Sequence, residues 1–255
     1  MRTPDLTRRD FLGRSVAALG AGRLASLPLD RARGPGARTR LSVVCVGAHP
    51  DDPESGCGGT LARYTAAGHA VKILYLTRGE RGIDGKSLEE AARIRTLEAE
   101  AACVVLGATP MFFGQVDGAA EATKPAVVAM TKLLAAEKPD VVLVHWPVDT
   151  HMDHQVASLL ATRACLALRT PSVFYFEVNP GSQTSAFQPT VYVDITPVLE
   201  KKRAALMAHV SQDGQGIWRA HHEATASWRG REHGVVAAEA FVPLRGASPG
   251  AMPGL

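Results

Sequence analysis

The sequence predicts an α/β fold, in which a mostly parallel β-sheet carries helices on both of its faces. From Leu41 onward, short apolar runs rich in β-branched residues alternate with longer segments of helical periodicity, as expected for successive strand–helix–strand units. The apolar runs are also nearly continuous instead of alternating with polar residues, which is typical of strands covered on both faces. Together these two observations indicate a Rossmann-like sheet.

The first half of this region has clear element boundaries. Gly68 and Gly107 each follow a helical segment, where glycine commonly ends a helix, and Pro139 marks the end of a third helix. The β-branched runs between these segments predict strands. We therefore expect strands over 41–48, 70–77 and 140–146, and helices over 59–68, 86–107 and 123–138.

The second half continues the alternation less regularly. We expect helices over 155–168, 197–209 and 217–229, strands over 172–177 and 190–196, and a last strand within 235–244. No internal repeat is visible, and the length suits one large domain. We therefore predict a single domain over 41–245, followed by a disordered tail over 246–255.

The first 40 residues have a different character. The segment "TRRDFLGRSVAALGAG", from Thr7 to Gly22, sets paired arginines ahead of Phe11 and Leu12 and a small, weakly apolar stretch. It resembles a twin-arginine export signal, with a disordered basic tail as the alternative interpretation. Residues 1–40 are therefore expected to be a signal and flexible leader. The expected partner is the twin-arginine export machinery, and the expected location is periplasmic or extracellular.

The charge distribution argues against binding to nucleic acid. Nine of the 28 basic residues and three of the 25 acidic residues lie in the first 40 positions, so the remainder holds 19 basic and 22 acidic residues. The globular part therefore has no overall positive field to hold a polyanion. No later run reaches the roughly 20 apolar residues of a membrane span. The four cysteines show no C-x-x-C spacing and are expected to pack in the core.

Polar loops follow three of the predicted strands. His49, Asp51 and Asp52 follow the first strand, "TRGERG" (77–82) follows the second, and "WPVDTHMDHQ" (146–155) follows the strand that ends near His145. Ligand sites in open α/β sheets gather at the carboxyl ends of the strands. We therefore expect these loops to meet at one edge of the sheet.

The first loop alone allows two interpretations. Asp51, Asp52 and Ser55 could cap the following helix by accepting its free N–H groups, or they could serve a metal site. A phosphate cradle fits less well, because "GCGG" (56–59) lacks the G-x-G-x-x-G order and lies beside two carboxylates.

The loop after the strand at 140–146 favours a metal. His151 and His154 flank Asp153 there, so the fold could bring them next to His49. One histidine and one aspartate from the first loop, with one histidine from the second, make a three-ligand N/O site with an open position. Such a donor set is typical of catalytic zinc.

The motifs "AHPDD", "GCGGTLA" and "THMDHQ" resemble those of the LmbE/PIG-L family of zinc-dependent N-deacetylases, which act on N-acetylglucosamine conjugates. The resemblance runs from about Leu41 to Leu244. It implies His49, Asp52 and His154 as ligands of one Zn²⁺, although the same donors can take Fe²⁺ or Co²⁺. It also implies Asp51 as the general base that takes a proton from the metal-bound water.

The same resemblance implies roles for three further residues. His151 matches a histidine that stabilises the oxyanion, for which we expect an imidazolium. Arg95 and Asp117 match positions that hold sugar hydroxyls, although an ion pair of Arg95 with Glu98 or Glu100 is an ordinary alternative. Glu80, Asp149 and His209 are weaker candidates. We expect His221, His222 and His233 to face solvent, and the three tryptophans to pack in the core more than to stack on sugar.

This chain departs from the family at Pro53, where the family usually has glutamate, and Glu54 follows it. The predicted activity is removal of an N-acetyl group from an amino-sugar conjugate. One alternative is a metal-dependent amidase for a larger sugar-thiol or natural-product amide. Others are a non-catalytic carbohydrate-binding relative, which would not need Asp51, and a nucleotide-binding module, which the acidic first loop disfavours.

Overall fold

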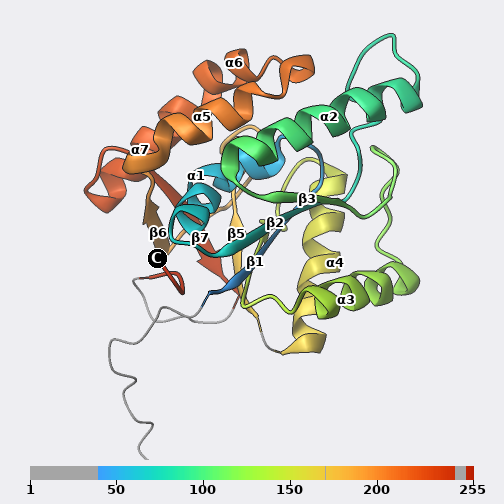
Figure 1. Ribbon diagram of the computed structural model, residues 1–255, viewed down its shortest axis with the longest axis horizontal. Coiled ribbons are helices and arrows are strands. Elements are labelled where there is room, and N and C mark those ends of the chain that lie inside the picture. Colours follow the sequence, from blue (N-terminus) through green and yellow to red (C-terminus); the bar gives the residue numbers. More distant parts are fainter. Residues whose placement is uncertain (1–39, 170, 245–250) are drawn as a thin grey trace, which may run out of the picture. The chain divides into compact units, whose positions relative to one another are not determined.

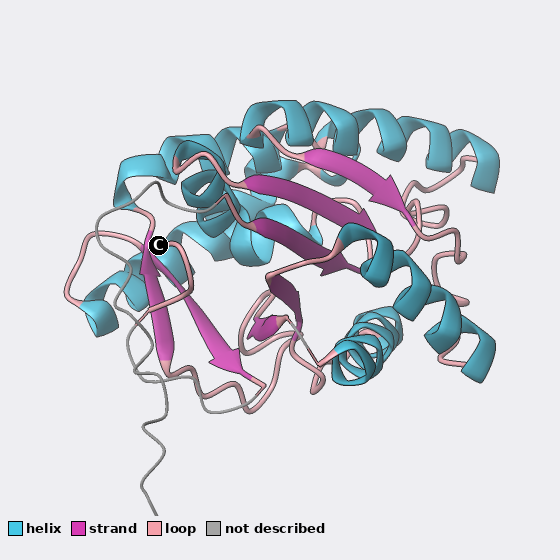
Figure 2. Ribbon diagram, turned by 60° about the horizontal axis from the view of Figure 1, so that its bottom comes forward, coloured by secondary structure: helices cyan, strands magenta, loops and turns pink. Residues whose placement is uncertain are grey.

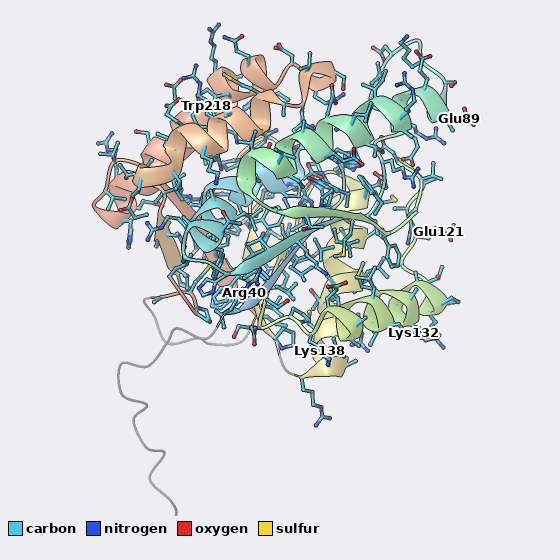
Figure 3. The ribbon with its side chains drawn as sticks, in the orientation of Figure 1. Arg40, Glu89, Glu121, Lys132, Lys138 and Trp218 are labelled. Carbon is cyan, nitrogen blue, oxygen red and sulfur yellow. The ribbon has the colours of Figure 1, made fainter. Side chains whose placement is uncertain are left out.

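A computed structural model describes residues 40–169, 171–244 and 251–255. The predicted leader therefore lies outside the described residues, apart from Arg40. Within the described part, no helix is both long and apolar enough to span a membrane. The charged residues Glu89, Glu121, Lys132 and Lys138 point outward from the helices and loops that carry them (Figure 3).

A seven-stranded sheet with the order β3-β2-β1-β4-β5-β7-β6 forms the centre of the fold (Figures 1 and 2). Strands β1 (Ser42–Gly47), β2 (Ala70–Tyr75), β3 (Thr109–Phe112), β4 (Val141–His145) and β5 (Ser172–Phe176) are parallel to their neighbours. Strand β7 (Ala238–Pro243) is antiparallel to both β5 and β6 (Val191–Asp194). The mostly parallel sheet confirms the predicted fold class. Strand β3 was not predicted, because a four-residue segment with Pro110 lacks a clear strand pattern.

Helices cover both faces of this sheet (Figure 1). One face carries α1 (Asp52–Ala66), α2 (Leu88–Leu106), α5 (Leu199–Met207) and α7 (Glu223–His233), and the other carries α3 (Lys124–Glu137) and α4 (Met152–Leu168). The single helix predicted over 217–229 is instead the end of α6 (Gly214–Ile217), a π-helical turn (Trp218–His222) and α7.

Strand β1 shows why the sequence requires two covering layers. Val43 and Cys45 belong to the core on one side of the sheet and Val44 and Val46 to the core on the other, and all four are fully buried. Each fully buried side chain of this size contributes about 1.5–3 kcal/mol of transfer free energy. If one face were uncovered, the fold would therefore lose several such contributions to its free energy of folding.

Helix α1 begins at Asp52, seven residues before the predicted start at Gly59. The glycines up to this position, which argued against a helix in the sequence, allow close packing. A Cβ atom on Gly59 would lie 2.7 Å from Cγ2 of Ile195, and one on Gly56 would lie 2.9 Å from the backbone oxygen of Glu177. The "GCGG" segment thus lets α1 approach neighbouring elements, which agrees with the argument against a phosphate cradle.

The predicted disordered tail is wrong for residues 251–255, whereas residues 245–250 lie outside the described part. Met252 is buried in the core, and the Tyr64 hydroxyl donates to the backbone oxygen of Pro253 at 3.0 Å. The Nε2 atom of His69 lies 3.3 Å from the backbone oxygen of Gly254. One buried apolar side chain and two polar contacts therefore hold residues 251–255. Their small residues and proline gave no sign of this in the sequence.

Candidate metal centre

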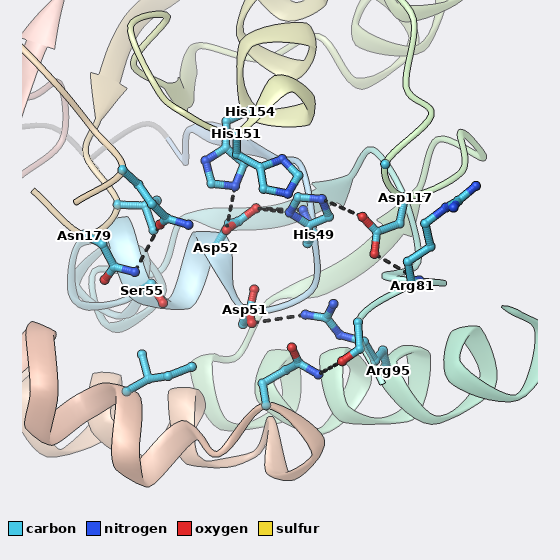
Figure 4. A pocket seen from close by; sticks show the side chains of 16 residues that line it. His49, Asp51, Asp52, Ser55, Arg81, Arg95, Asp117, His151, His154 and Asn179 are labelled. Atoms are coloured by element: carbon cyan, nitrogen blue, oxygen red, sulfur yellow. Dashed lines mark hydrogen bonds and ion pairs between the residues drawn. The ribbon is translucent and has the colours of Figure 1, made fainter. Parts of the chain in front are cut away.

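The polar loops meet where the order of the strands reverses direction. The chain moves from β1 to β2 and β3 on one side, and then returns to β4 on the other side of β1. Ligands bind at such switch points, outside the carboxyl ends of the strands. The loop after β1 carries His49, Asp51 and Asp52, and the loop after β4 leads to His151 and His154. Side chains predicted from two distant motifs therefore lie together (Figure 4).

Asp52 lies at the centre of the predicted ligand set. Its Oδ2 is 3.1 Å from Nδ1 of His49, and its Oδ1 is 3.3 Å from Nε2 of His154. All three side chains are buried. Three overlapping sets of donors lie within 4.8 Å in this region, and each set contains at least one of these three residues: His49, His151 and His154; Asp52, His145 and His154; and His49, Asp117 and Asp153.

The outer nitrogens of both histidines lie against carboxylates. Nε2 of His49 is 3.1 Å from Oδ2 of Asp153 and 3.2 Å from Oδ1 of Asp117. Nδ1 of His154 is 3.1 Å from Oδ1 of Asp149. Carboxylates in this position fix the tautomer of a ligating histidine and raise its basicity. The inner nitrogens, Nδ1 of His49 and Nε2 of His154, therefore face Asp52, and this N/O donor set fits a divalent cation.

The ionisation of the cluster reflects this crowding. Although burial disfavours charge, the Asp52 carboxylate raises the pKa of His49 well above its usual value and that of His154 to about 9. Burial likewise opposes ionisation of Asp52, but the neighbouring histidines, with the charge of His154 foremost, hold its pKa well below the usual range. A carboxylate that stays ionised beside basic imidazoles provides the charge that a bound cation needs.

Asp51 follows His49 closely but does not join this cluster. It precedes α1 with φ of 107°, a region that non-glycine residues rarely adopt, and its side chain makes no capping hydrogen bond. The capping interpretation is therefore wrong for Asp51. Its Oδ2 accepts a hydrogen bond of 3.1 Å from Nη2 of Arg95. Burial raises the pKa of Asp51, with Arg95 acting in the opposite direction.

Arg95 is buried and pairs with Asp51, so the alternative of a surface ion pair with Glu98 or Glu100 is wrong. Its Nη2 donates to Asp51 and also to the backbone oxygen of Pro50. Arg95 therefore ties helix α2 to the loop that follows β1. Gly79 and Gly82 make this possible, because a Cβ atom on either would collide with the Arg95 guanidinium. The two glycines of the "TRGERG" loop (77–82) therefore leave the space that the Arg95 side chain occupies.

Asp117 lies closer to His49 than a purely sugar-binding residue requires. Its Oδ1 faces His49, and its Oδ2 accepts the backbone N–H of Arg81 at 3.1 Å. Burial opposes ionisation, but the contact with His49 lowers the pKa of Asp117 to about 2. Glu80 supports this arrangement by accepting the backbone N–H of Asp117 at 3.1 Å.

His151 caps α4, and its Nδ1 accepts the backbone N–H of Asp153 at 3.2 Å. Its proton therefore resides on Nε2. Burial, with the charges of His49 and His154, lowers the pKa of His151. The expected imidazolium is thus replaced by a neutral imidazole, which can still donate one hydrogen bond.

Two further histidines, His145 and His209, are buried in the structure. His145 ends β4, and its ring stacks on His154 with the centroids 4.2 Å apart. Burial and the charge of His154 lower the pKa of His145 to about 4. A histidine at the end of an apolar strand gave no signal beyond its position. His209, for which the sequence left a place at the edge of the site and a surface position open, is fully buried, with Nε2 3.6 Å from Oε2 of Glu54.

The remaining aromatic and histidine predictions had mixed outcomes. Trp218 is buried as expected, Trp146 packs edge-on against Tyr175, and Trp228 is exposed. His221 and His233 face solvent, but the prediction for His222 is wrong because that residue is buried. All four cysteines are buried and unpaired, which confirms core packing.

The site opens into a hollow of about 440 Å³. Asp51, Arg95 and His151 line it together with His49, Asp52 and His154, and none of the tryptophans does. The lining also includes the neutral polar side chains Asn179, Gln183 and Gln212, together with Arg81 and the apolar Ile217. Such a mixture of neutral hydrogen-bonding groups and apolar surface suits a polyhydroxylated ligand.

Comparison with known proteins finds one family. A sequence model of the PIG-L family, described as GlcNAc-PI de-N-acetylase, matches residues 44–165. Diacetylchitobiose deacetylase of Thermococcus kodakarensis is 30% identical over 193 residues, which cover 69% of this chain and 72% of that protein.

A solved structure and a second relative extend the comparison. N,N'-diacetylchitobiose deacetylase from Pyrococcus horikoshii, complexed with an inhibitor, superposes with a TM-score of 0.71 at 26% identity, covering 83% of this chain and 84% of that chain. A 4-oxalmesaconate hydratase of Pseudomonas putida is 29% identical over 192 residues, which cover 68% of this chain and 74% of that protein. Similar sequences thus include two kinds of enzyme.

Proposed function

The chain belongs to the PIG-L family of de-N-acetylases, and we propose that it is a metal-dependent hydrolase that removes the N-acetyl group from an N-acetylglucosamine-type conjugate. One observation carries this proposal. Two imidazoles and the Asp52 carboxylate gather at the switch point, and a second carboxylate, Asp51, lines the same hollow.

His49, Asp52 and His154 would hold the cation, which we take to be Zn²⁺, with Fe²⁺ or Co²⁺ as alternatives for the same donors. A cation bound there would polarise the acetyl carbonyl and lower the pKa of water toward about 7. Asp149 and the pair Asp117 and Asp153 keep the two imidazoles oriented toward it.

Asp51 is the proposed proton carrier. It takes a proton from the attacking water and then gives that proton to the departing amine. Arg95 holds the Asp51 carboxylate in place through its Nη2. His151 donates from Nε2 to the carbonyl oxygen as negative charge develops there, a contact typically worth about 2.7–4 kcal/mol. We also propose that Arg95 and Asp117, which line the hollow, contact the sugar hydroxyls.

A hydratase is the second candidate, because one relative is a 4-oxalmesaconate hydratase. The hollow does not exclude it by charge. Arg81 and Arg95 line the hollow together with Asp51, Asp52 and Asp117, and a divalent cation held by His49, Asp52 and His154 would add two positive charges. The substrate itself must therefore distinguish the two activities.

A substrate panel tests these alternatives. Metal-loaded protein is incubated with N-acetylglucosaminides, with bulky sugar-thiol or natural-product amides, and with an unsaturated polycarboxylate. The proposal predicts release of primary amine from the N-acetyl sugars. Amine from bulky amides alone would make the protein an amidase, hydration of the polycarboxylate would make it a hydratase, and sugar binding without turnover would leave a carbohydrate-binding protein.

We further propose export by the twin-arginine machinery, on the evidence of Arg8, Arg9 and the weakly apolar stretch that follows. Fusion of residues 1–40 to a folded reporter is expected to direct it out of the cytoplasm. The variant with both Arg8→Lys and Arg9→Lys should stay inside, and equal export of both fusions would contradict the proposal.

A further inference from the structure

His145 lies behind the metal site and contacts both loops that build it. It is buried at the end of β4, between the rings of His154 and Phe176, with centroid distances of 4.2 and 4.7 Å. Its Nε2 accepts the backbone N–H of Ala48 at 3.0 Å. Ala48 directly precedes His49, so one imidazole contacts the ring of one predicted ligand and the N–H of the residue before another.

The hydrogen bond from Ala48 determines what His145 can do. A backbone N–H can only donate, so Nε2 of His145 uses its lone pair as an acceptor and the ring proton resides on Nδ1. Nε2 also lies 3.3 Å from Oδ2 of Asp52, but an ionised carboxylate cannot donate, so the Ala48 N–H is the donor that occupies the Nε2 lone pair. That lone pair is then not available to a cation. His145 is therefore a support of the site and not a fourth ligand.

The same bond fixes the direction in which the chain leaves β1. The backbone oxygen of Ala48 accepts the N–H and the hydroxyl of Thr77, each at 3.0 Å. The Ala48 residue is thus held from β4 on one side and from the loop after β2 on the other. Loss of the His145 acceptor would leave a buried N–H without a partner, and such a group costs about 1–3 kcal/mol. We would then expect the backbone to shift at Ala48, directly before the predicted ligand His49.

We propose that His145 is a positioning residue that sets metal affinity through the Ala48 N–H and the His154 ring, without touching the metal. This inference rests on the proposed metal centre. His145 lies outside both sequence motifs, yet it would align the two loops that carry the ligands. These loops come from segments about one hundred residues apart.

Metal affinity, measured by competition with a chromophoric chelator, tests the inference on purified metal-free protein. His145→Phe keeps a ring but removes the acceptor, whereas Gln at this position can present its Oε1 where Nε2 stood. Replacement of an outer-shell partner typically weakens metal binding about 10- to 100-fold. We expect a loss of that size for H145F and recovery toward wild type for H145Q. If H145F does not fold, H145N, whose shorter side chain cannot reach the Ala48 N–H, replaces it.

His69 provides a matched control at the other end of β1. It is also buried, and its Nδ1 accepts the backbone N–H of Leu41 at 3.1 Å. H69F removes an equivalent backbone hydrogen bond next to the opposite end of β1, and we expect its metal affinity to stay at the wild-type level. Equal affinity of folded H145F and wild type would overturn the inference, as would an equal loss in H69F. Wild-type protein that binds no metal would instead overturn the proposed metal centre itself.

Discussion

Asp149 is a buried residue that would influence metal binding through its contact with His154. Its Oδ1 lies 3.1 Å from Nδ1 of His154, while its Oδ2 accepts the Thr184 hydroxyl at 3.0 Å. Burial opposes its ionisation, but the contact with His154 lowers the pKa of Asp149. An ionised carboxylate here makes the opposite nitrogen of His154 a better donor to a cation.

Asp149→Asn keeps the shape of this side chain and removes its charge. We expect metal affinity to fall about tenfold or more, because the imidazole loses its anionic partner. Chelator competition measures the change. Asp140→Asn is the control, since Asp140 accepts the Ser42 N–H near the start of β1, away from the site. Unchanged affinity in D149N would show that His154 does not depend on this carboxylate.

The sequence marked the side chains of the site better than it marked their supports. Histidines and aspartates clustered directly after apolar strands predicted His49, Asp52 and His154 as neighbours, and the structure brings them together. His145 and Asp149 each stand alone in the sequence, and only the folded sheet shows that they face His154. Their roles depend on distances that no local spacing encodes.

At the scale of elements, the π-helical turn before α7 carries a buried histidine that the sequence placed at the surface. His222 lies in this turn, and its Nε2 has no partner among the described residues. Burial, followed by the charges of Lys202 and His221, lowers the pKa of His222 to about 3. The folded state therefore keeps this residue neutral over a range in which the unfolded chain binds a proton.

This shift predicts a pH-dependent stability. The folded pKa of His222 lies below the unfolded value of about 6.5, so its contribution is intact above pH 6.5 and is lost as the pH falls toward 3. The loss amounts to about 1.4 kcal/mol per pH unit within that window. We expect His222→Leu to flatten the free energy of unfolding between pH 6.5 and 4.5, as measured by denaturant titration. His221→Leu, at an exposed neighbour, should leave the slope unchanged, and an unaltered slope in H222L would contradict the prediction.

The segment 251–255 is a second element whose order was missed. Met252 is buried against the core. Replacing a buried methionine with alanine typically costs about 2–5 kcal/mol. We expect M252A to lower the free energy of unfolding by about 2 kcal/mol, whereas Ala251→Ser, at an exposed neighbour, should change it little. Equal stability of the two variants would mean that the segment does not contribute to the core.

At the scale of the whole molecule, the fold was predictable because its strongest signals are long. The apolar runs of β1, β2, β4 and β5 and the glycines that follow α1 and α2 lie where the pattern placed them. The antiparallel pairing of β7 with β5 and β6 could not be predicted, since strand order and direction depend on contacts between distant segments. The short β3 and the interrupted region from α6 to α7 lack enough periodic residues to show.

This topology explains why two motifs about one hundred residues apart act as one site. Strands β1 and β4 are neighbours in the sheet, and both end at the same edge. Helix α2 adds Arg95 from one face, and α4 begins at Met152, so that it carries His154. We therefore expect this edge of the sheet to hydrolyse an N-acetyl group with Asp51 as the proton carrier.

The sharpest test is primary-amine release from diacetylchitobiose by wild-type protein and D51N at matched metal content. We expect wild type to release amine and D51N to lose about 10²- to 10⁴-fold in kcat, since a general base contributes that much. Removal of the metal by a chelator should stop the wild-type reaction. Equal rates for wild type and D51N, or no amine from metal-loaded wild type, would contradict this expectation.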